Sequence, residues 1–313
     1  MIFAMSMRFQ IKKMIKKIVT LLLLLIFSYL LIMKVKLNYE LEKANNRLHD
    51  YNSQNIKLSY GNISYAEIGK GEVILSCHGL FGGYDQGIEN LKSLSKYMRI
   101  IAPSRFGYLE SDVKGKGTPK DQSKAYVELL DKLGIDKVYV MGASAGGTSA
   151  IRFALDYPEM CKGLILYCSA MPETKKSENV NLKQGPAEIL VNNYMMYITS
   201  PFFKATMGME QEVIKTMLPI DLRKLGVKID SEITNPDMSL NFNDYKIENL
   251  QIPTLILQAK DDKIVDYNKT LAAAGRFPNL TLKIFENGGH MIKGHGEEID
   301  KYVLEFINSN SHK

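Results

Sequence analysis

The chain has 313 residues, 45% hydrophobic and 24% charged, a composition that excludes a wholly disordered or collagen-like protein. Its length suits one α/β domain of roughly 250 residues with an added segment. The net charge of +6 is local, because five of the 40 basic residues precede residue 18 and the remaining 35 are balanced by 34 acidic residues. We therefore expect no nucleic-acid partner, which would require a basic surface on the folded domain.

A basic cluster and an apolar run open the chain. The cluster comprises Arg8, Lys12, Lys13, Lys16 and Lys17. The run, Ile18 to Met33, is uncharged and would span about 24 Å as a helix. Flanking lysine stems can extend it toward both interfaces of a ~30 Å hydrocarbon core. Residues 1–37 are thus expected to be a transmembrane signal-anchor.

Positive charge is retained in the cytoplasm, so the N-terminus is expected inside and the rest of the chain outside, at the cell membrane. A cleaved signal peptide and a buried soluble helix are the alternatives. No small-residue cleavage site follows the run, which favours the anchor.

A change of pattern follows the anchor. Residues 38–55 are polar and are expected to form a helical or extended stalk. Residues 56–60 and 63–68 then alternate with period two around Gly61-Asn62, which predicts a hairpin with its turn at that dipeptide.

Short apolar runs next alternate with helical patterns, as in a protein built from βαβ units. The expected strands are residues 73–77, 100–102, 138–141, 163–167, 254–258 and 280–285, and the expected helices are 86–96, 120–133, 146–157, 267–277 and 297–307. Continuous apolar runs suit strands buried on both faces, so the expected fold class is α/β with a mostly parallel, doubly wound sheet.

One long interval interrupts this alternation. Between Tyr167 and Thr254 no clear strand is present, and helical patterns occupy residues 187–198 and 210–218. An excursion of this length in a compact domain indicates a functional insertion. The expected organisation is a helical cap, residues 172–250, on a core formed by residues 56–171 and 251–313.

The strongest chemical signal is the segment Gly142-Ala-Ser144-Ala145-Gly146, which ends a buried strand and opens a helix. In this context G-x-S-x-G forms a sharp turn that raises the serine hydroxyl above the sheet edge. Small residues at 142 and 146 allow close backbone packing there. Ser144 is therefore the candidate nucleophile; an ordinary Gly/Ser loop is the plain alternative.

A second glycine-rich turn, starting at His78-Gly79-Leu80, follows another buried strand. Acyl transfer needs preorganised N–H donors for an oxyanion. The backbone N–H groups of Leu80 and Ala145 are the candidates. His78 precedes the nucleophile on a different strand, and we expect a structural imidazole that bonds the loop.

A serine nucleophile needs a base and a carboxylate that orients the base. His290 follows the last expected strand in a glycine-rich loop and is the candidate base, with His295 as the alternative. Asp262, just past the strand at 254–258, is the candidate carboxylate, with Asp261 and Asp266 as alternates. No clustered Cys/His ligands and no phosphate loop are present, so we expect neither a metal nor an organic cofactor.

In the chain order Ser144, Asp262, His290, these motifs resemble the α/β-hydrolase family, in the branch with a helical cap. The resemblance covers residues 56–307 and includes the segment 103–111. It implies a Ser-His-Asp triad, with Leu80 and Ala145 as oxyanion donors. Two departures are Ala259, where many members have glycine, and the N-terminal anchor.

The resemblance implies a membrane-anchored serine hydrolase that cleaves an ester-like carboxylic substrate, either a small molecule or a lipid-like ester, through an acyl-enzyme. The same triad also serves C–C bond hydrolases, aminopeptidase-type peptidases and acyltransferases. A membrane-tethered binding protein with an unused triad is the alternative from another class. The cap is rich in Met, Tyr and Phe, which either line an apolar pocket or pack the cap onto the core.

Overall fold

The computed structural model describes residues 2–311, with side chains from residue 7 onward. Eight strands form one sheet in the order β1-β2-β4-β3-β5-β6-β7-β8. They are β1 Gln54–Leu58, β2 Gly61–Ile68, β3 Glu72–Cys77, β4 Met98–Pro103, β5 Val138–Ala143, β6 Cys161–Tyr167, β7 Thr254–Ala259 and β8 Leu280–Phe285. The pairs β1–β2 and β2–β4 are antiparallel and the other five are parallel. The mostly parallel α/β sheet predicted from the sequence is confirmed.

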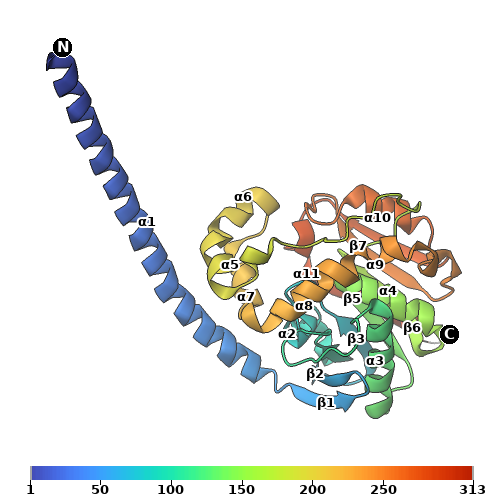
Figure 1. Ribbon diagram of the computed structural model, residues 1–313. Coiled ribbons are helices and arrows are strands. Elements are labelled where there is room, and N and C mark those ends of the chain that lie inside the picture. The colour runs from blue at the N-terminus through green and yellow to red at the C-terminus, as the bar shows by residue number, and fades with distance from the viewer. Residues whose placement is uncertain (1, 312–313) are drawn as a thin grey trace.

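Helices cover both faces of the sheet, because the buried strands point alternate side chains into two cores. On one face α3 (Pro119–Lys132), α4 (Gly146–Asp156) and α10 (Tyr267–Ala274) pack against strand residues such as Val140 and Leu164. On the other face α2 (Tyr84–Glu89) and α11 (Gly296–Asn310) pack against residues such as Tyr139 and Ile165. The sheet is therefore doubly wound, as Figure 1 shows.

The chain between β6 and β7 is helical. It contains α5 Asn193–Thr199, α6 Phe203–Met207, α7 Gln211–Met217, α8 Lys224–Ile229 and α9 Asn235–Leu240, joined by short 3-10 and π turns. We use the name cap for residues 172–250. In Figure 1 its helices α5, α6 and α7 lie between the sheet and the long N-terminal helix.

The first hairpin forms, but its turn lies two residues earlier than predicted. Leu58 pairs with Gly61, so the turn is Ser59-Tyr60, and Gly61-Asn62 begins β2. Gly61 has φ +109°, and a Cβ there would lie 2.5 Å from the Cβ of Asp112. Glycine is thus required at 61 by its left-handed backbone and by a close neighbour, and not as the centre of the turn.

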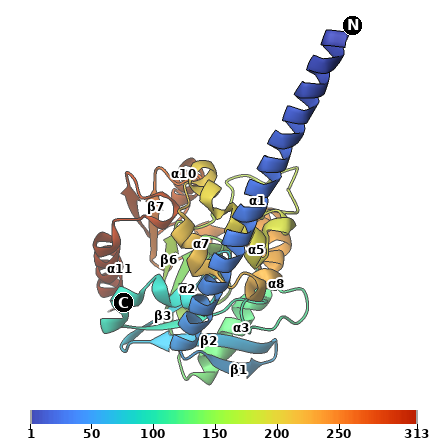
Figure 2. The ribbon, with the colours of Figure 1, turned by 90° about the vertical axis from the view of Figure 1, so that its left-hand side faces the viewer.

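Helix α1 (Ile2–Asp50) is continuous through the apolar run and the polar residues that follow it. From Met7 to Ile32 its large apolar side chains are exposed, apart from the half-buried Leu30. Within the described residues it is long and apolar enough to cross a membrane. Beyond that stretch one face becomes buried, at Met33, Leu37, Ala44 and Leu48. Figure 2 shows this lower half of α1 passing across the domain.

Candidate active site

Ser144 lies on a strained turn between β5 and α4. Its φ of +50° is in the left-handed region, which is rare for a residue with a side chain. A Cβ on Gly146 would lie 2.2 Å from the backbone oxygen of Cys77, and one on Gly142 would lie 2.7 Å from the Cα of Gly147. Glycine at both positions therefore lets the turn pack against the ends of β3 and α4.

Three side chains from separate loops form a hydrogen-bonded chain at the carboxyl ends of the strands. His290 Nε2 lies 2.9 Å from Ser144 Oγ. His290 Nδ1 lies 2.9 Å from Asp262 Oδ2. With the proton on Nδ1, the imidazole donates to the carboxylate and the serine hydroxyl donates to Nε2. The structure thus brings together the predicted nucleophile, base and acid, which are separated by 146 and 28 residues in sequence.

The Asp262 carboxylate is held as an anion. Burial raises its pKa, but the hydrogen bond and charge of His290, together with the N–H groups of Val265 and Ile264, outweigh this effect and lower the pKa below its ordinary value. Oδ1 accepts those N–H groups at 2.8 Å from Ile264 and 3.0 Å from Val265. Oδ2 also accepts from Gln258 at 3.1 Å. The replacement of glycine by Ala259 does not prevent this placement.

The alternative acids, Asp261 and Asp266, and the alternative base, His295, make other contacts. Asp261 accepts the N–H groups of Gly288 and Gly289 and so anchors the loop that carries His290. Asp266 caps the N-terminus of α10. His295 contacts Asn287 and Glu298.

The turn after β3 lies against the nucleophile. A Cβ on Gly79 would be 3.1 Å from the Cβ of Ser144. Gln86 Oε1 accepts the N–H of Gly79 at 2.7 Å, which fixes the turn. Among the hydrogen bonds of residues 2–311, none uses the backbone N–H of Leu80 or Ala145. Both groups are therefore available to an oxyanion beside Ser144.

His78 is buried and bonded within the loop. Its Nδ1 lies 2.8 Å from Gly79 O, and its Nε2 accepts the backbone N–H of Arg105 at 2.8 Å. Burial, and then the charge of Arg105, lower the pKa of His78 well below its ordinary value. The imidazole is neutral and holds the turn in shape.

Sequence reasoning missed a buried arginine behind this turn. Arg105 donates to the carbonyl oxygens of His78 and Gly79 at 2.9 and 3.2 Å. It also pairs with Asp230 of the cap, and Tyr108 donates to the same carboxylate at 2.5 Å. The segment 103–111 is part of the family resemblance, but nothing local in the sequence points to a partner 125 residues away.

A second buried carboxylate joins three parts of the chain. Asp85, in α2, is contacted by Arg223 of the cap at 2.7 Å and by Arg47 of α1 at 2.8 Å. Arg223 also donates to Gly82 O at 2.6 Å, in the turn that contains Leu80. Helix α1, the cap and the turn are thus bonded to one another.

An apolar cluster surrounds the same turn, which contributes Leu80 and Phe81. Helix α1 contributes Met33 and Leu37. The cap contributes Val191, Met196, Tyr197, Phe203, Ile214, Leu218, Ile220 and Val227. The predicted oxyanion donor Leu80 therefore packs against an apolar cluster to which both the cap and α1 contribute.

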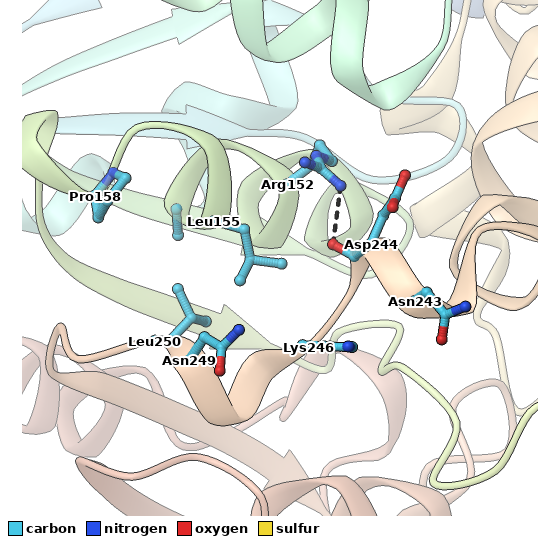
Figure 3. A pocket seen from close by; sticks show the side chains of 9 residues that line it. Arg152, Leu155, Pro158, Asn243, Asp244, Lys246, Asn249 and Leu250 are labelled. Atoms are coloured by element: carbon cyan, nitrogen blue, oxygen red, sulfur yellow. Dashed lines mark hydrogen bonds between the residues drawn. The ribbon is translucent and has the colours of Figure 1, made fainter.

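The pocket in Figure 3, of about 210 Å³, is a separate feature. It lies between the C-terminal end of α4 and residues 243–250, where Arg152 donates to Asp244 O at 2.9 Å. Ser144 precedes the opposite end of α4. The residues that line this pocket do not include Ser144, Asp262 or His290, and we assign the pocket no part in the site.

Comparison with known proteins identifies similar chains. A sequence model of the alpha/beta hydrolase fold matches residues 72–246. The chain is 26% identical over 263 residues to 2-hydroxy-6-oxononadienedioate/2-hydroxy-6-oxononatrienedioate hydrolase 2 of Pseudomonas putida, over 78% of this chain and 91% of that protein. It is 24% identical over 281 residues to 2-hydroxy-6-oxo-6-phenylhexa-2,4-dienoate hydrolase of Burkholderia cepacia, over 80% and 92%.

Solved structures are similar as well. A meta-cleavage product hydrolase from Pseudomonas fluorescens IP01 superposes with a TM-score of 0.62, at 20% identity, over 82% of this chain and 97% of that one. At this identity the similarity is one of fold alone.

Proposed function

Because the chain belongs to the alpha/beta hydrolase fold family, we propose that it is a serine hydrolase with Ser144 as nucleophile, His290 as base and Asp262 as the carboxylate that orients the base. The observation that carries the proposal is the pair of 2.9 Å hydrogen bonds that join these side chains. Their roles follow from the chemistry of such a chain.

The proposed reaction has two steps. His290 takes the proton of Ser144 as Oγ attacks a carbonyl carbon, and the N–H groups of Leu80 and Ala145 stabilise the oxyanion. The tetrahedral adduct collapses, the leaving group takes a proton from the imidazolium, and an acyl-enzyme remains. Water, activated by the same imidazole, then releases the acid.

C–C bond hydrolysis is the first candidate reaction. The names of the relatives in Pseudomonas putida and Burkholderia cepacia describe 6-oxo acids. A ketone has no heteroatom leaving group, so its hydrolysis breaks a C–C bond and the leaving carbon must be protonated. The imidazolium of His290 would supply that proton. The relatives thus support this reaction over the ester hydrolysis that the sequence motifs first suggested.

Ester hydrolysis is the second candidate, favoured by the charges around the site. A substrate with carboxylates needs a cationic partner. The two arginines nearest the turn, Arg105 and Arg223, are already paired with Asp230 and Asp85. The apolar cluster beside Leu80 suits an uncharged acyl group instead.

The test combines active-site labelling with two substrates. We expect a fluorophosphonate probe to label the wild type and a Ser149→Ala control, which alters another buried serine in α4, but not Ser144→Ala. Turnover of 2-hydroxy-6-oxo-6-phenylhexa-2,4-dienoate without turnover of p-nitrophenyl esters would identify a C–C hydrolase, and the reverse an esterase. A wild type that is neither labelled nor active would support the binding-protein alternative, and undiminished labelling of Ser144→Ala would refute the assignment.

The apolar run of α1 supports a proposal about location. Residues 18–33 would span a membrane, with the basic N-terminus in the cytoplasm and the hydrolase core, residues 56–171 and 251–313, outside with its cap. Protease protection of a tagged N-terminus in sealed cells tests this orientation. Digestion of the tag from outside would contradict it.

A further inference from the structure

The cap is hydrogen-bonded to α1 near the C-terminal end of the apolar run. Tyr29 donates from its hydroxyl to the backbone oxygen of Ile198, at 3.0 Å. The Tyr194 hydroxyl lies 3.5 Å from the backbone oxygen of Leu30. The apolar run ends at Met33, four residues beyond Tyr29, which is about 6 Å along a helix axis. The cap thus contacts α1 within the last turns of the apolar run.

Apolar packing and an ion pair add to these hydrogen bonds between α1 and the cap. Met33 and Leu37 of α1 are 6% and 4% exposed, and they share the apolar cluster with Phe203 of the cap. Lys215 of α7 also lies 3.5 Å from Glu40. In Figure 1, α5 and α6 lie beside the middle of α1, whereas β1 lies at the far end of the domain. The cap, rather than the sheet, is the part nearest the apolar run.

The cap residues that begin at the Tyr29 contact, 198–207, have exposed apolar side chains. We call this segment the cap edge. Phe202 is 64% exposed and Met207 is 38% exposed. The only charged residue of the cap edge is Lys204, and it pairs with Glu210 of the adjoining turn at 2.9 Å. Exposed aromatic and apolar side chains beside a neutralised charge pair are typical of surfaces that enter the interfacial region of a bilayer.

We propose that the cap edge contacts the lipid bilayer that α1 spans, so that the membrane interface covers Phe202 and Met207. The inference rests on the proposed membrane span and extends the proposed function. A lipid bilayer is the occupant that the positions favour, because the cap edge is continuous with an apolar helix surface at the same level.

The absence of tryptophan from the chain makes a direct test possible. Three single-tryptophan variants of the full chain are placed in phosphatidylcholine vesicles without bromine, with bromine on the acyl chains near the headgroup, or with bromine at mid-chain. Phe202→Trp reports the cap edge, Phe27→Trp reports the apolar run, and Tyr97→Trp is the control. Tyr97 is 53% exposed and directly precedes the amino end of β4, whereas the site lies at the carboxyl ends of the parallel strands.

We expect brominated lipid to quench the emission of Phe202→Trp and Phe27→Trp and to leave that of Tyr97→Trp unchanged. Quenching of Phe27→Trp alone would overturn the proposal, since the cap edge would then lie away from the lipid. An emission of Phe202→Trp that is blue-shifted but unquenched would also overturn it, in favour of a second copy of the chain on this surface. If Phe27→Trp is unquenched too, α1 is outside the bilayer and the proposal fails.

Fluorophosphonate labelling of the same three variants is independent of lipid quenching. It therefore separates a failure of this inference from a failure of the proposed hydrolase activity.

Discussion

Arg105, in the loop after β4, and Asp230 of the cap form a two-point ion pair behind the turn beside Ser144, with Nη1–Oδ1 at 2.5 Å and Nη2–Oδ2 at 2.6 Å. Both side chains are buried, at 3% and 1% exposure. Since Arg105 also donates to the carbonyl oxygens of His78 and Gly79, the pair connects the position of the cap to the shape of the proposed oxyanion turn.

Arg105→Met is expected to lower the free energy of unfolding by about 3–5 kcal/mol, because it leaves the Asp230 carboxylate buried without its cation. Arg99→Met is the control. Arg99 pairs with Glu67 at the surface, where both side chains are about one-third exposed, and such a pair is worth about 0.2–1 kcal/mol. Urea unfolding of both variants measures the difference. If both variants lose the same free energy of unfolding, burial does not make the Arg105–Asp230 pair more important for stability than a surface pair.

Asp262→Asn is expected to reduce kcat by roughly 10³–10⁴-fold with the fold intact, because an amide neither holds the required tautomer of His290 nor stabilises its charged form. Asp266→Asn should retain full activity, since asparagine caps a helix as well as aspartate does. Turnover per labelled serine, with circular dichroism as the check on folding, compares the two. Loss of activity in Asp266→Asn instead would reassign the acid.

Strand positions and the order of the triad could be predicted because their signals are local. The run from Leu280 to Phe285 is predicted with both of its observed ends. The nucleophile turn, the last-strand loop and the acid loop each follow a buried strand. In a parallel sheet, the loops after such strands meet at one edge.

The features that could not be predicted depend on partners far apart in the sequence. The carboxylates of Asp230 and Asp85 bind arginines 125 and 138 residues away, and neither arginine has a local pattern that sets it apart from a solvated one. The predicted position of the hairpin turn is wrong for a related reason. The signal at Gly61 reflects the neighbouring side chain of Asp112, which is distant in sequence.

Leu37→Ala should destabilise the contact between α1 and the cap by about 2–5 kcal/mol, since the side chain is 4% exposed in the apolar cluster. Val35→Ala, at a position 65% exposed on the same helix, should change stability by no more than about 0.5 kcal/mol. Thermal unfolding in detergent micelles measures both. If the two variants unfold at the same temperature, the lower half of α1 is not docked on the cap in solution.

The stability of the α1–cap connection should fall in acid through Asp85. Burial raises the pKa of Asp85, but the ion pairs with Arg223 and then Arg47 outweigh this effect and lower the pKa from 3.8 to about 2. A pKa that is lower in the folded state contributes stability above the unfolded pKa and loses it as the pH falls toward the folded pKa. The contribution, on the order of 2 kcal/mol, is therefore present above pH 4 and lost between about pH 4 and pH 2.

Asp85→Asn should be less stable than the wild type at pH 7, because it leaves Arg223 buried without its anion. It should also lose stability less steeply below pH 4, because the titrating carboxyl is gone. Asp136→Asn, at an exposed position, should keep the slope of the wild type. Urea unfolding at intervals from pH 2 to pH 6 measures all three. If Asp85→Asn keeps the wild-type slope, other carboxyls, and not the one that binds Arg47 of α1 and Arg223 of the cap, cause the acid sensitivity.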